Sequence, residues 1–205
     1  MRKNIILIFA FVSSIGFAQE LDLKNDYRGM FSLGARTTLS TFNWHHEESN
    51  GFGVGGQFRL QFADRVNSDW FFDYIISEIG DYANRTDYHI GWSVLYYPTA
   101  NPNSSLRPYI LAGHCFDYTQ MVSKRNSINR LERWSSAVQG GAGVHFNLSE
   151  RLDLSLVGQY MVHLGNEIHA HEHNGVVHFE DSGGASLEGH MLFHIGINYK
   201  IGDLW

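Results

Sequence analysis

Histidine is the residue type in this sequence with the clearest capacity for chemistry. The chain has 12 histidines among 205 residues, and an imidazole can bind a transition metal or exchange a proton near neutral pH. Half of them lie in two polar stretches, and half lie in segments where apolar and polar residues alternate. The polar stretches hold His45, His46, His169, His171, His173 and His178, and the alternating segments hold His89, His114, His145, His163, His190 and His194.

The stretch 168–181, IHAHEHNGVVHFED, has the pattern of a metal-binding surface. Three of its four histidines are spaced two residues apart, so in an extended chain their side chains form one row. Imidazole with carboxylate suits zinc, copper(II) or nickel, so we predict a transition-metal site. The alternative is an exposed polar loop that binds metal only adventitiously. The candidate ligands are His169, His171, His173 and His178, with His45 and His46 from the stretch HHEE, and with Glu172, Glu180 and Asp181 expected nearby.

The rest of the chain indicates the strands that must position these histidines. From residue 28 onward the dominant period of hydrophobicity is two, which is typical of strands with one apolar face. In 152–164, for example, Leu152, Leu154 and Leu156 alternate with more polar residues. The segments are about 10–13 residues long, against about five or six in soluble proteins. The eight predicted strands are 29–41, 52–63, 70–80, 88–97, 109–118, 137–148, 152–164 and 190–201.

The two faces of these segments predict a membrane-spanning barrel. One face is apolar and aromatic, and the other is rich in Gly, Gln, Ser and His rather than in Lys and Glu. Outward aromatic residues near strand ends are typical of membrane girdles, and lipid requires a closed sheet. We therefore predict an all-β fold, an eight-stranded antiparallel up-and-down transmembrane β-barrel. The residues expected to face outward include Trp70, Phe72, Tyr74, Trp92, Tyr96, Tyr109, Cys115, Phe146, Tyr160 and Tyr199.

The connections favour one orientation in the membrane. With the N-terminus in the periplasm, the outer loops are 42–51, 81–87, 119–134 and 166–188, and the inner turns are 64–69, 98–107 and 149–151. Because the last strand of a closed barrel pairs with the first, the two histidine-rich stretches should be neighbours. The third outer loop is basic, so it could meet lipopolysaccharide phosphates or simply be solvated.

The N-terminus has the three parts of a Sec signal peptide: positive charge, a short apolar run, and small residues at Gly16 and Ala18. The apolar run is too short to span a membrane as a helix, which needs roughly 20 residues. We predict that 1–18 is cleaved and that 19–205 forms a single barrel domain.

Together, the export signal, eight alternating segments, glycine-rich inner faces and a terminal aromatic resemble the small outer-membrane β-barrel proteins of Gram-negative bacteria. These are the OmpX-, OmpW- and OmpA-barrel-like "porin family" proteins. The resemblance implies a monomer in the cell outer membrane, with lipid and lipopolysaccharide as surroundings. It also implies assembly by the barrel-assembly machinery, which reads the aromatic end of the last strand; Tyr199 and Trp205 hold that spacing here.

Several functions are excluded or weakened by the same sequence. A net charge of −6 argues against nucleic-acid binding, and a single cysteine excludes a disulfide scaffold. The strand histidines, all expected to face inward, should fill the narrow interior as a polar network; the alternative is a small-solute channel that responds to pH. A lipid A deacylase has a His-x-Ser pair on a late strand, but here Gly165 follows His163 and Leu164. We therefore expect a structural or binding role and no enzyme.

Overall fold

The computed structural model describes residues 28–41, 50–186 and 189–205. The predicted signal peptide 1–18 and the candidate ligands His45 and His46 lie outside the described residues. Within those three ranges, no helix is long and apolar enough to cross a membrane.

Strands supply all the regular structure of the described residues, and they run from 11 to 22 residues in length. Such lengths agree with the long strands predicted from the alternation. The strands are β1 (Met30–Thr41), β2 (Gly51–Ala63), β3 (Val66–Ile79), β4 (Ala83–Tyr96), β5 (Leu106–Ser123), β6 (Arg130–Asn147), β7 (Leu152–His173), β8 (Val176–Ser186) and β9 (Gly189–Asp203).

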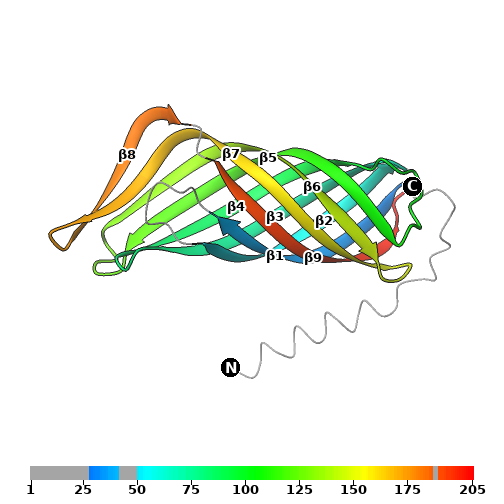
Figure 1. Ribbon diagram of the computed structural model, residues 1–205, viewed down its shortest axis with the longest axis horizontal. Helices are drawn as coiled ribbons and strands as arrows, with labels where there is room; N and C mark the ends of the chain where they lie inside the picture. The colour runs from blue at the N-terminus through cyan, green and yellow to red at the C-terminus, as the bar shows by residue number, and fades with distance from the viewer. Residues whose placement is uncertain (1–27, 42–49, 187–188) are drawn as a thin grey trace, which may run out of the picture.

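Eight of these strands close into an antiparallel barrel, as predicted. Each of β1 to β6 pairs with the strand that follows it in the chain, and β9 closes the ring by pairing with both β7 and β1. At the closing seam Leu33 lies opposite Tyr199, with a register shift between Phe31 and Ser32. The ninth strand, β8, pairs only with the end of β7 among the described strands. Figure 1 shows β7 and β8 extending beyond the other strands, at the opposite end from the C-terminus.

The predicted outer loop 166–188 is instead mostly a β-hairpin. β7 continues to His173, and β8 returns from Val176. The two linking residues, Asn174 and Gly175, both have positive φ, 51° and 79°. This is the conformation of the tight turn that Asn-Gly favours between antiparallel strands. The other predicted loops also shorten, because strands extend into them: only three residues separate β3 from β4.

Apolar residues cover the outside of the barrel. Ile110, Phe116 and Ile195 are each more than half exposed, which is the pattern of a surface that faces lipid rather than water. Aromatic side chains form two rows across neighbouring strands. The rows are Tyr74–Tyr88–Tyr118–Trp134, with ring centroids 4.8–5.8 Å apart, and Phe58–Trp70–Trp92, with centroids 5.8 and 6.3 Å apart.

Strand β5 reverses three of the predicted orientations. Tyr109 and Cys115 were expected outside and are buried inside, whereas His114 was expected inside and lies on the outer face. There His114 hydrogen-bonds to Ser136 and packs edge-on against Phe116. The residues 109–118 have apolar side chains on both faces, so hydrophobicity alone could not define the inward face of this strand.

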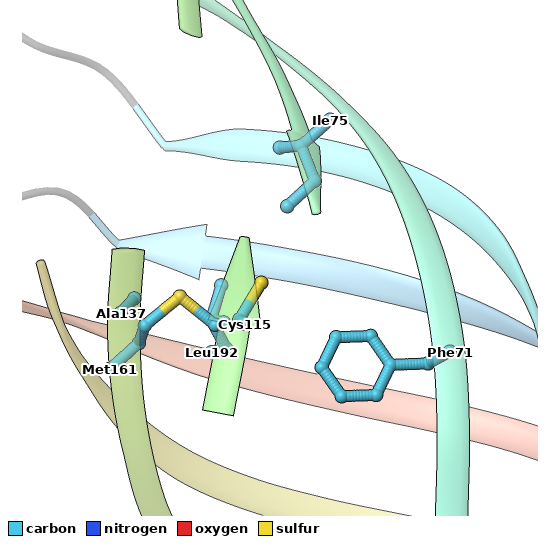
Figure 2. Packing of buried hydrophobic residues seen from close by; sticks show 6 residues of the cluster. All are labelled: Phe71, Ile75, Cys115, Ala137, Met161 and Leu192. Carbon is cyan, nitrogen blue, oxygen red and sulfur yellow. The ribbon is translucent and has the colours of Figure 1, made fainter. Parts of the chain in front are cut away.

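Three apolar clusters interrupt the polar interior. The central cluster draws on β3, β5, β6, β7 and β9, and Figure 2 shows Met161 and Cys115 beside Leu192 with the Phe71 ring nearby. Leu95, Tyr97, Tyr109 and Leu111 form the cluster nearer the C-terminus. The cluster at the hairpin end includes Ile79, Tyr82, Met121, Ile168 and Val177. Along β5, Asp117 lies between Cys115 of the central cluster and Met121 of the hairpin-end cluster, so a polar layer is enclosed between apolar ones.

Candidate functional site: the outer hairpin and the closed lumen

The hairpin made by the end of β7 and by β8 has one apolar face. Ile168 and Val177 on that face are buried against Ile79, Tyr82 and Met121 at the rim of the barrel. Packing against the rim fixes which way the hairpin lies. The residues that alternate with these two, including His169, His171 and His178, therefore face away from the barrel.

Hydrogen bonds to the rim and to the β5–β6 connection hold the hairpin in place. The Tyr82 hydroxyl donates to the carbonyl of Ala170 at 3.1 Å, and the Asn129 side-chain amide donates to the carbonyl of Val177 at 2.7 Å. The Arg125 guanidinium donates to Glu172 and to the carbonyl of Gly175, both at 2.7 Å. The connection predicted to be basic thus uses Arg125 to hold the hairpin, and Lys124 lies 3.2 Å from Glu78.

The exposed face of the hairpin carries the predicted histidine row. The register sets His171 opposite His178 and His169 opposite Glu180, with His173 opposite Val176. The rings of His171 and His178 stack with centroids 5.8 Å apart, and Nε2 of His171 lies 3.7 Å from Oε1 of Glu180.

This face differs from the prediction in its carboxylates. Glu172 and Asp181 belong to the opposite face, since Glu172 pairs with Arg125 and Asp181 lies opposite Ile168. Glu180 is therefore the acidic residue beside the histidine row. Across the described residues, no three His, Cys, Asp or Glu side chains are already gathered in a geometry that could hold a metal ion.

A second histidine group lies inside the barrel, around Asp117. His163 Nδ1 is 3.1 Å from one carboxylate oxygen, and His89 Nε2 is 3.4 Å from the other. His163 Nε2 hydrogen-bonds to His190 Nδ1 at 3.2 Å. All four side chains are essentially inaccessible to solvent. Asp117 was not singled out in the sequence, because nothing in its own strand shows that four other strands bring three histidines and an arginine to this cluster.

Arg133 joins this cluster to the hairpin. One guanidinium nitrogen is 3.4 Å from Asp117, and another donates at 2.7 Å to the carbonyl of Asn166, where the hairpin leaves the barrel wall. The hydroxyl of Ser135 also donates to Asp117, at 3.1 Å, and lies 3.4 Å from His163 Nδ1. A catalytic triad needs its serine and carboxylate on opposite ring nitrogens. Here both face Nδ1, so the group is a hydrogen-bond network of a different kind.

Many of the remaining inward polar residues also bond to one another. Arg36 forms a bidentate pair with Asp73, whose carboxylate also accepts a hydrogen bond from Thr38. Thr38 in turn bonds His194 at 2.9 Å. His145 bonds Ser155 and Tyr97 through its two ring nitrogens, at 2.8 and 2.9 Å. Side chains thus fill this lumen, as an eight-stranded barrel allows.

A closed antiparallel sheet with an apolar exterior and a filled polar interior is the construction of a membrane-spanning β-barrel. By fold, the protein is a small eight-stranded barrel of the bacterial outer-membrane type. No protein-family model matches the sequence, and no curated protein sequence matches it.

Among solved structures, the barrel is similar to that of Neisserial surface protein A (NspA), with a TM-score of 0.63 at 13% identity over 83% of this chain and 96% of that one. It is also similar to OprG from Pseudomonas aeruginosa, with a TM-score of 0.56 at 15% identity over 85% and 97%. Ail, the attachment invasion locus protein of Yersinia pestis, gives 0.50 at 13% identity over 84% and 98%. At these identities the likeness shows the fold, and it confirms the fold expected from the resemblance to small outer-membrane barrels.

Proposed function

We propose that this protein is a non-enzymatic binding protein of the outer membrane that acts through the exposed face of the β7–β8 hairpin. The observation that carries the proposal is the contrast between the two faces of that hairpin. One face packs on the rim and is anchored by Tyr82, Asn129 and Arg125, and the other exposes histidines and a glutamate. A surface held in place in this way can bind a ligand at little ordering cost.

The ligand that suits this face best is a divalent transition-metal ion. His171 and His178 are cross-strand neighbours with stacked rings, and Glu180 lies beside them. Side-chain rotation could turn two imidazoles and a carboxylate toward one ion, a ligand set that suits zinc, copper(II) or nickel. His169 and His173 lie at the neighbouring positions of the same row, and His45 and His46 remain candidate ligands from the first predicted outer loop.

Two further features support a binding role over transport. The described lumen is filled with bonded polar groups and three apolar clusters, which favours a barrel that does not conduct. Among the similar structures, NspA is named a surface protein and Ail an attachment invasion locus protein.

A calorimetric titration of detergent-refolded barrel with zinc, copper and nickel tests the proposal. We expect one-to-one binding of micromolar or tighter affinity, lost when His169, His171, His173 and His178 are all changed to Ala. Glu132→Gln, which alters an exposed carboxylate on β6, is the control and should bind as the unmodified protein does. Weak binding at many sites, or binding unchanged by the four-histidine variant, would refute the metal as ligand.

Recording in planar bilayers tests the lumen separately. A barrel that does not conduct gives no single-channel steps between pH 5 and pH 8. Regular steps that change with pH over that interval would favour the alternative, a narrow channel whose interior histidines titrate.

A further inference from the structure

An open pocket lies on the outer surface of the barrel, at the end that carries the hairpin, where β2 and β4 begin and β3 ends. Its volume is about 590 Å³, within the range of about 300–1,000 Å³ that small-molecule sites occupy. Two of the lining residues, Ser77 and Arg85, are buried and have their side chains toward the lumen. The full lining is Asn50, Phe52, Tyr74, Ile76, Ser77, Glu78, Asn84, Arg85 and Thr86.

The part of this pocket nearer the middle of the barrel is apolar. Phe52 lies opposite Ile76 on the neighbouring strand, and the two side chains are 55% and 50% exposed. Tyr74, on the same face of β3 as Ile76, belongs to the outward aromatic row that begins with its contact to Tyr88. Such rows lie at the boundary between the hydrocarbon and the headgroups of a bilayer. This part of the pocket is therefore suited to an acyl chain.

The part of the pocket nearer the rim is polar. Glu78 lies opposite Asn84, and Thr86 lies opposite Ile76. Along the outer face of β3 the side chains thus change from Tyr74 and Ile76 to Glu78 in the direction of the rim. A site with an apolar end at the boundary of the bilayer and a polar end beyond it matches an amphiphilic molecule.

The polar groups of the pocket favour a headgroup with hydroxyls. The amide of Asn84 and the hydroxyl of Thr86 can each donate and accept hydrogen bonds, whereas the carboxylate of Glu78 only accepts. Sugar hydroxyls also donate and accept, so they can pair with all three groups. An ionised phosphate only accepts, and beside Glu78 it would meet a like charge.

The basic side chains around the pocket already face acids. Lys124 lies 3.2 Å from Glu78, Arg130 lies 3.3 Å from Glu132, and Arg85 lies 3.1 Å from Asp87 on the lumen side. These ion pairs offset the positive charge that would attract a phosphate. The charges therefore favour an uncharged headgroup over an anionic one.

We propose that this pocket binds one glycolipid. Its acyl chain would lie against Phe52 and Ile76, and its uncharged sugar headgroup would form hydrogen bonds with Glu78, Asn84 and Thr86. The pocket is separate from the histidine face of the hairpin, so this site does not depend on the proposed metal-binding function.

Competition among lipids that have the same acyl chains tests the headgroup. The barrel, refolded in lauryldimethylamine oxide because this detergent has no sugar, is mixed with equal amounts of diglucosyl diacylglycerol, phosphatidylethanolamine and phosphatidylglycerol. Native mass spectrometry then records which lipid stays bound. We expect one glycolipid per protein, retained at least about fivefold more than either phospholipid, as one additional hydrogen bond would give.

A matched pair of variants tests the place of binding. Thr86→Trp puts an indole into the pocket and should lower glycolipid retention at least about fivefold, a loss similar to that of one hydrogen bond. Gln120→Trp is the control, because Gln120 lies opposite Thr86 on the outer face of β5 but does not line the pocket. This control should retain the glycolipid as the unmodified protein does.

A second variant tests the polar end and serves in case Thr86→Trp does not fold. Asn84→Leu removes the amide and keeps the apolar part of the pocket. The preference for the glycolipid over the two phospholipids should therefore fall, while retention of the phospholipids stays the same.

Four results would overturn the proposal. They are no retained lipid, equal retention of the three lipids, preference for a phospholipid, and equal loss of glycolipid from the Thr86 and Gln120 variants. Equal retention would mean that the barrel holds acyl chains without reading the headgroup. Because no metal is added, none of these results bears on the function proposed for the hairpin.

Discussion

The hairpin and the lumen use histidine in opposite ways. His171 on the hairpin is about half exposed and lies near Glu180 without a close contact, whereas His163 in the lumen is buried and bonded at both ring nitrogens. A bonded, buried imidazole has its lone pair or its proton committed to the protein. An exposed imidazole keeps both for a ligand. The comparison teaches that the number of partners, more than the residue type, separates a structural histidine from one that can bind a ligand.

The largest expected loss in free energy of unfolding comes from removing Asp117, the centre of the lumen cluster. Asp117→Ala leaves His89, His163 and the Arg133 guanidinium without their shared carboxylate. Loss of one partner of a buried charge pair costs about 3–5 kcal/mol. Equilibrium urea unfolding in detergent micelles would measure it, with Glu132→Ala on the exposed side of β6 as the control. A loss of less than about 1 kcal/mol would mean that the lumen network is not what stabilises the barrel.

The next largest effect is expected from a substitution in the turn of the hairpin, which should affect the hairpin and leave the lumen unchanged. Gly175 has φ of 79°, where any side chain is strained by about 1–2 kcal/mol. Gly175→Ala should therefore loosen the hairpin and leave the barrel intact. Amide hydrogen exchange should rise in β8 and at the end of β7 only. Faster exchange spread through β1 to β6 would contradict the independence of the hairpin.

A single anchoring hydrogen bond should have a smaller effect. Tyr82→Phe removes the donor to the carbonyl of Ala170 but keeps the ring in its apolar cluster. The cost should be about 1 kcal/mol, visible as faster exchange of hairpin amides with unchanged global unfolding. If the hairpin amides of this variant exchange as in the unmodified protein, packing rather than this bond holds the hairpin.

The smallest effect on stability is expected at the exposed face itself. His178→Ala should change the free energy of unfolding by no more than about 0.5 kcal/mol, as for other surface positions. The same substitution should weaken zinc binding measurably by calorimetry. A variant that is strongly destabilised would place His178 with the structural histidines and remove the contrast on which the proposed function depends.

The barrel was predictable because its signal is repeated in every strand. Alternation over ten or more residues and polar inward faces leave few other folds, and the spacing of His169, His171 and His173 correctly indicated one row. The hairpin was missed although Asn174 and Gly175 mark a tight turn, because the surrounding histidines and acids give a polar average typical of a loop. The alternation of Ile168 and Ala170 with those histidines was the available signal.

The partners of each side chain were beyond the sequence, because they depend on register between strands. Asp117 became the centre of a cluster only when β4, β6, β7 and β9 were aligned with β5. The orientation of β5 was itself ambiguous, since Tyr109 and Cys115 are as apolar as the outward residues between them. Where both faces of a strand are apolar, only the neighbouring strands determine which face lies inside.

The length of β7 also determines where a ligand could meet this protein. A strand rises about 3.3 Å per residue, so the nine residues from Gly165 to His173 add roughly 30 Å of strand beyond Leu164, the last exposed large apolar residue of β7. The histidine face thus lies on a β-hairpin whose length exceeds the depth of a lipid headgroup layer. An ion or macromolecule in solution could contact the tip of the hairpin without first touching the bilayer. Shortening each strand of the hairpin by two residues at a time would bring the histidine face closer to the membrane and leave it facing away from the barrel.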